Sequence, residues 1–172
     1  RKNINLFAET FEPIEDNYYN IHDTALWNSS NPLGALIHIV IPMDNGTVVC
    51  SGFSSNTWIF STMQAPLSWS YDGIHPVAGN RVFSYYTNPN DGSITIYTRG
   101  VDRFSVVEED DTPIINLIME TGAFAGADGL WSDMQDKLAL HINTNGGNAA
   151  PVQPIKNRPN YEGIRKYLRG EV

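Results

Sequence analysis

The stretch from Asp72 to Arg81 contains an acid, an imidazole, an amide and a guanidinium within ten residues. Histidine is the usual general acid or base near neutral pH, which makes His75 the candidate proton-transfer residue. Arg81 follows closely, and a guanidinium can hold an anionic group through two parallel N–H donors. The alternative is a structured turn, in which Asp72-Gly73 reverses the chain and Arg81 pairs with Asp72.

A second stretch of similar chemistry runs from Thr95 to Arg103. Side chains alternate along a strand, so Tyr97 and Arg99 should share one face with Thr95. If this strand pairs with residues 81–87, we expect that face to adjoin Arg81. The alternative is that the arginines of this stretch form ion pairs with nearby acids.

These two stretches and the aromatic residues before them define a candidate anion site. Aromatic side chains beside the histidine could stack on a sugar or a base, or equally anchor the loop in the core. The catalytic candidates are His75, Arg81, Arg99 and Tyr97. The substrate-binding candidates are Trp69, Tyr71, Asn80, Tyr85 and Arg103.

The remaining histidines and the cysteine favour structural roles. His38 interrupts an apolar run and is expected to be a hydrogen-bonded core residue. Cys50, the only cysteine, is expected to be a buried small apolar residue. No two histidines have a short metal-ligand spacing, so we expect neither a metal nor another cofactor.

The charge is unevenly distributed along the 172 residues, whose net formal charge is −8. There is no Lys or Arg between Asn3 and Asn80, whereas five of the last 17 residues are basic. This balance argues against an extended nucleic-acid surface, which needs clustered cations. It permits a small anion pocket, and it allows a protein partner to meet either the acidic body or the basic tail.

The elements that position these residues are predicted to be strands first and helices afterwards, in a single domain of residues 1–172. Residues 1–34 look irregular, and about five or six strands are expected between residues 35 and 107. Asn45-Gly46 indicates a type I′ hairpin turn. A loop is predicted over residues 64–80, followed by a hairpin of strands 81–87 and 93–98 around the turn Asn88–Gly92. Gly100 is expected to separate two strands. Helices are predicted over 112–122 and about 129–144, and a basic helix within 156–172. This order indicates an α+β fold with an antiparallel sheet or partial barrel.

Two classes of function follow from these observations. The first is a cofactor-independent hydrolase or transferase acting on a phosphate-bearing substrate, such as a phosphodiesterase or nuclease-like toxin domain. The second is a non-catalytic module that binds a glycan, a peptide or a protein. The Asn- and Ser-rich composition with few charges favours a secreted or exported protein, and no segment is apolar enough to span a membrane.

Overall fold

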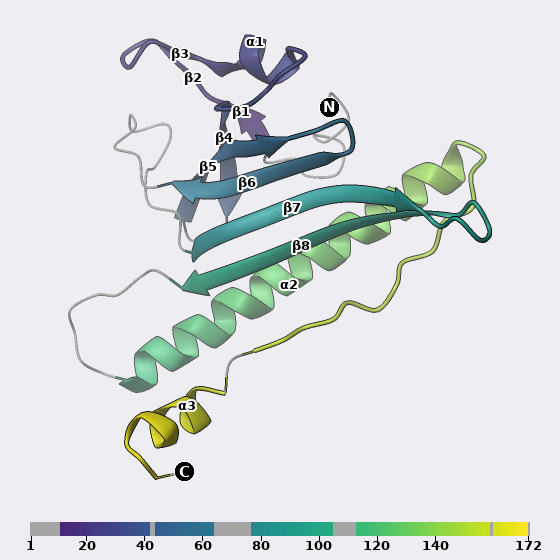
Figure 1. Cartoon of the computed structure of the whole chain (residues 1–172). Helices are drawn as coiled ribbons and strands as arrows, with labels where there is room; N and C mark the ends of the chain where they lie inside the picture. The colour runs from purple at the N-terminus through teal and green to yellow at the C-terminus, as the bar shows by residue number, and fades with distance from the viewer. Residues whose placement is uncertain (1–10, 42–43, 64–76, 105–112, 159, 172) are drawn as a thin grey trace. The chain divides into compact units, whose positions relative to one another are not determined.

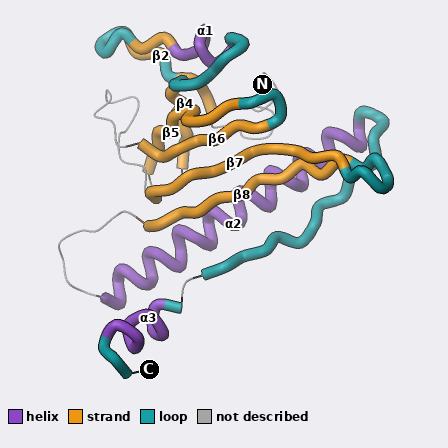
Figure 2. The backbone as a smooth tube through the Cα atoms, viewed as in Figure 1, coloured by secondary structure: helices purple, strands orange, loops and turns teal. Residues whose placement is uncertain are grey.

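The structure, a computed structural model, describes residues 11–41, 44–63, 77–104, 113–158 and 160–171 (Figure 1). Six strands form one antiparallel sheet in the order β1-β4-β5-β6-β7-β8. Figure 2 shows β6, β7 and β8 lying side by side in this sheet. The helices follow this sheet in the chain, which confirms the predicted α+β class. The strands of the sheet are β1 (Phe11–Pro13), β4 (Leu36–Ile41), β5 (Asp44–Phe53), β6 (Thr57–Met63), β7 (Val77–Thr87) and β8 (Ile94–Phe104).

The described part of the N-terminal segment, residues 11–34, contributes to the core, and the prediction of irregular structure there is wrong. Besides β1 it forms a small two-stranded sheet, β2 (Glu15–Asp16) and β3 (Ile21–His22), and the helix α1 (Asp23–Asn28). Its apolar side chains pack on the sheet, where the rings of Phe11 and Trp27 lie 5.3 and 5.8 Å from that of Phe60. Aromatic side chains dominate core energetics because each buries a large area.

The hairpin between β4 and β5 has a different register from the one that Asn45-Gly46 predicts. Val40 pairs with Asn45, so this dipeptide belongs to the strand. The observed register places Ile37 opposite Val48, and both are buried. Register follows the need to bury one face, and here that need outweighs the local turn preference.

β7 and β8 are longer than predicted, and they pair without interruption over 11 residues each. β7 begins at Val77, within the segment predicted to be a loop. β8 continues through Gly100, which was expected to separate two strands. The predicted connection between them is confirmed, because Asn88 donates its backbone N–H to the Ser93 carbonyl and Gly92 has a φ of +72°.

The chain divides into two compact units, Arg1–Met134 and Gln135–Val172. A single helix, α2 (Pro113–Thr144), replaces the two predicted helices, because Gly122 does not end it. In the second unit, the basic helix α3 (Tyr161–Leu168) begins at Asn160, whose side chain accepts the Gly163 N–H. None of the helices in the described residues is both long and apolar enough to cross a membrane.

Candidate functional site

The register between β7 and β8 assigns the predicted site residues to two opposite faces. Arg81 pairs with Gly100, while Arg99 pairs with Val82. Because residues directly opposite each other share a face and neighbours along a strand alternate, Arg81 and Arg99 point to opposite sides of the sheet. The expectation that these two arginines adjoin one anion is therefore wrong.

One side carries Arg81, Phe83 and Tyr85, and we call it the Trp131 face. Trp131 of α2 packs on it, with its ring 5.6 Å from that of Phe83 and 4.1 Å from the Arg81 guanidinium carbon. Cation–π contact of this kind is strongest where the cation is partly desolvated. Tyr85, predicted to bind substrate, therefore lies on the same face as Arg81 and on the opposite face from Tyr97 and Arg99.

Arg81 is held by partners within the sheet. Its Nη2 donates to Asp102 Oδ2 at 2.6 Å, and Nη1 lies 3.5 Å from the Thr98 hydroxyl. The Arg81 and Asp102 side chains are only 17% and 20% exposed. The guanidinium lies over Gly100, because a Cβ built there would be 2.5 Å from Nη2. Arg81 thus already has an anionic partner in Asp102, while Asp72, the partner considered from the sequence, lies outside the described residues.

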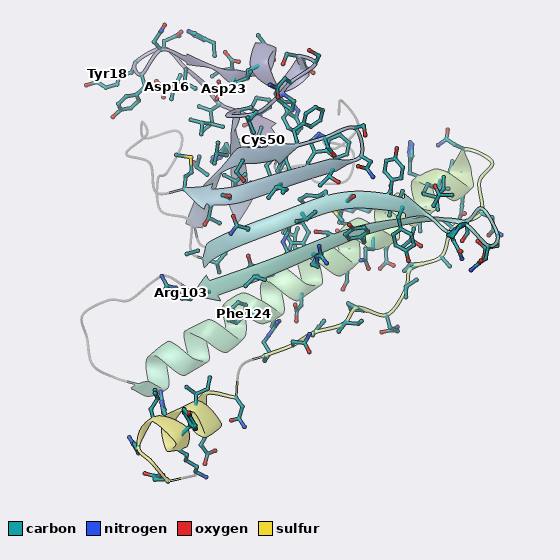
Figure 3. All side chains as sticks on the ribbon, viewed as in Figure 1. Asp16, Tyr18, Asp23, Cys50, Arg103 and Phe124 are labelled. Atoms are coloured by element: carbon teal, nitrogen blue, oxygen red, sulfur yellow. The ribbon has the colours of Figure 1, made fainter. Side chains whose placement is uncertain are left out.

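The other side of β7 and β8 is the Arg99 face, and it carries Asn80, Tyr97, Arg99, Val101 and Arg103. Arg99 and Arg103 are both exposed, and among the described residues neither forms an ion pair. Arg103, labelled in Figure 3, lies near the C-terminal end of β8. The guanidinium of Arg99 lies 5.9 Å from the Tyr97 ring, and Val101 between the two arginines is 81% exposed.

A row of hydroxyl and amide groups crosses the strands beside this face. The Ser51 and Ser61 hydroxyls lie 2.6 Å apart, and the Ser61 hydroxyl donates to Asn80 Oδ1 at 2.5 Å. Asn80 accepts through its oxygen and so keeps the two N–H donors of its NH₂ group, and the register pairs Asn80 with Val101. The sequence predicted Asn80 as a site residue but not Ser51 and Ser61. The alternation of side chains along β5 and β6 was the signal that could have indicated these two serines.

His38 of β4 is 4% exposed, which confirms the predicted core location, while the predicted hydrogen bonding of its ring stays a prediction. The register places Glu12 of β1 and Thr47 of β5 on either side of it. Burial lowers the pKa of His38 below its ordinary value, and the Glu12 carboxylate opposes that shift. Thr47 is fully buried, and its hydroxyl has no hydrogen-bond partner among the described residues.

Three of the predicted site residues belong to a part of the chain that the structure does not describe. His75, Trp69 and Tyr71 lie outside the described residues. Cys50 is fully buried, as predicted, and its thiol lies 3.7 Å from the Gly52 carbonyl. Within the described ranges, no three His, Cys, Asp or Glu side chains gather in a way that could hold a metal.

The structure therefore places Tyr97, Arg99, Arg103 and Asn80 on one face of the sheet, and Arg81 and Tyr85 on the other. Two exposed guanidinium groups, a tyrosine ring and an amide can bind a carboxylate or a phosphate by charge-assisted hydrogen bonds. Comparison with protein-family models, with curated proteins and with solved structures finds no match for this chain.

Proposed function

We propose that this chain is a binding module whose Arg99 face holds an anionic ligand. One observation carries the proposal: Arg99 and Arg103 are exposed on one face without an ion pair in the described residues. The net charge of −8 does not oppose this, because charges beyond about 8–10 Å are largely screened at physiological ionic strength. The Asn80 amide and the Tyr97 ring supply neutral contacts beside the two cations.

The arrangement favours binding over catalysis because its described members are cations, an aromatic ring and an amide. Arg81, expected to stabilise charge during a reaction, is engaged by Asp102 on the other face. The phosphate-directed hydrolase or transferase remains a prediction, and it requires His75. A loss of hydrolysis of a phosphodiester substrate in a folded His75→Ala variant would support that alternative.

The binding proposal is tested by titrating the full chain with inorganic pyrophosphate and following backbone amide chemical shifts. We expect the shifts to concentrate on β8, and the Arg99→Gln/Arg103→Gln double variant to bind at least tenfold more weakly. The matched control is Arg165→Gln/Arg169→Gln, which removes the same charge from α3 and its C-cap. Equal weakening by both double variants, or no shifts on β8, contradicts the proposal.

A further inference from the structure

The two edge strands of the sheet differ in how well they are protected against pairing with a further strand. β1, at one edge, is three residues long and contains Pro13, which has no backbone N–H to offer. β8, at the other edge, runs for 11 residues without proline, lysine or a break in register. Among the described residues, no strand pairs with its outer side. Proteins normally blunt such edges with short strands, proline, lysine or bulges, since an open edge is a template for another strand.

The side chains of β8 indicate the chemistry of a strand that would fit. Arg99 and Arg103 lie four residues apart on one face, about 13 Å at 3.3 Å per residue. Val101 between them is 81% exposed, and Ile96 on the opposite face is 49% exposed. Residues directly opposite in a sheet interact as pairs, so a matching strand has two acids four positions apart with an apolar residue midway.

A second copy of this chain fits the same edge poorly. Antiparallel pairing of β8 with itself would gather two arginines from each copy on one face of a two-stranded ribbon. Like charges directly opposite destabilise a strand pair, and each copy also carries a net charge of −8. Asp102 would not relieve this repulsion, because it lies on the other face and pairs with Arg81.

We propose that β8 is the docking edge for an extended acidic segment of a partner protein, which adds to the sheet as a seventh strand. This inference rests on the proposed anion-binding function and specifies its ligand. Main-chain hydrogen bonds to β8 provide affinity, while Arg99 and Arg103 select acidic side chains. The two acidic residues of the partner pair with Arg99 and Arg103, whose spacing they match, and the apolar residue between them covers Val101.

The test uses the full chain and a synthetic peptide, Glu-Thr-Val-Thr-Glu-Thr-Thr-Ile, with two N-methylated versions. One version carries methyl groups on its odd-numbered amides and the other on its even-numbered amides. A strand that pairs through one edge tolerates methyl groups on its far edge only. We therefore expect one methylated peptide to bind like the parent and the other at least tenfold more weakly, by fluorescence anisotropy.

The outcomes of this experiment distinguish strand addition at β8 from anion binding by the Arg99 face. If both methylated peptides bind as the parent does, strand addition is wrong while anion binding by the Arg99 face stands. If neither the parent peptide nor pyrophosphate binds, both proposals are wrong. A parent in which lysine replaces glutamate should not bind, and equal binding of that peptide overturns the charge selection. A β8-mediated dimer that the acidic peptide cannot dissociate, observed by light scattering, overturns the choice of partner.

Discussion

Arg81 and Asp102 are joined across β7 and β8 by a 2.6 Å contact between Nη2 and Oδ2, beneath the ring of Trp131. The two residues are not directly opposite, since Arg81 pairs with Gly100 and Asp102 with Gly79. The diagonal contact is possible because glycines occupy both of the positions opposite. This relationship makes Arg81 a structural residue of the sheet, and it leaves Arg99 and Arg103 as the exposed cations of β8.

Replacing Asp102 tests the structural role of this pair. Asp102→Asn is expected to lower the free energy of unfolding by about 1–3 kcal/mol, because it leaves a partly buried guanidinium without its counter-charge. Chemical denaturation measures the change, and Arg99→Gln serves as the control. The exposed Arg99 has no ion pair in the described residues, so its replacement should change stability by no more than about 0.5 kcal/mol. Equal effects of the two substitutions would refute the assignment.

Replacing Gly100 tests whether the absence of a side chain at this position in β8 makes room for the Arg81 guanidinium. A Cβ at this position would lie 2.5 Å from Nη2 and 2.7 Å from Cζ of Arg81. Gly100→Ala must therefore displace a guanidinium that Asp102 and Trp131 hold, and we expect a loss of about 1–2 kcal/mol in urea unfolding. Gly122→Ala is the matched comparison, because nothing lies within 4 Å of its Cβ position in α2. That substitution should stabilise the protein by about 0.5–1 kcal/mol, since glycine is a poor helix former.

Two threonines on adjacent strands should respond oppositely to replacement by valine. The buried Thr47 hydroxyl has no partner in the described part of the chain, so Thr47→Val should raise stability by about 1 kcal/mol. The Thr62 hydroxyl accepts the Gly79 N–H at 2.9 Å, so Thr62→Val should lower stability by about 1–2 kcal/mol. Thermal unfolding of both variants decides the point, and a destabilised Thr47→Val protein would show that its hydroxyl is bonded.

His38 should make stability depend on pH. Its folded pKa is lowered by burial, so the unfolded chain binds the proton more readily. The contribution of His38 to the free energy of unfolding is complete above the ordinary histidine pKa, about 6.5. It is lost as the pH falls below that value, by at most about 1.4 kcal/mol per pH unit. Urea midpoints between pH 8 and pH 5 measure this loss.

The slope is assigned to His38 by comparison with a His38→Gln variant, which should show a shallower decline over the same range. Glu12→Gln removes the carboxylate that opposes the shift, so its decline should continue to lower pH. Thr47, which pairs with His38 from β5, has no ionisable group and so does not add to the pH dependence. Identical slopes in the wild type and in His38→Gln would exclude the histidine as their source.

Local signals predicted much of the element order. Apolar, β-branched and aromatic runs bounded by turn residues placed strands within residues 35–107, and the Asn88–Gly92 turn joins β7 and β8 as expected. Turn and helix-stop signals failed at Asn45-Gly46, Gly100 and Gly122, where longer elements continue. Each of these glycines tolerates the strand or helix at a cost of about 1 kcal/mol or less, which packing of the whole element can exceed.

The sequence by itself determined the α+β class, the burial of His38 and Cys50, and the shared face of Tyr97 and Arg99, because these follow from local alternation and apolarity. Only the tertiary structure decided that Arg81 faces away from Arg99. A shift of one residue in the pairing of β7 with β8 would reverse that result, and the register depends on burial across the whole sheet. The tertiary structure also decided the ion-pair partner of Arg81, since Asp102 lies 21 residues away along the chain.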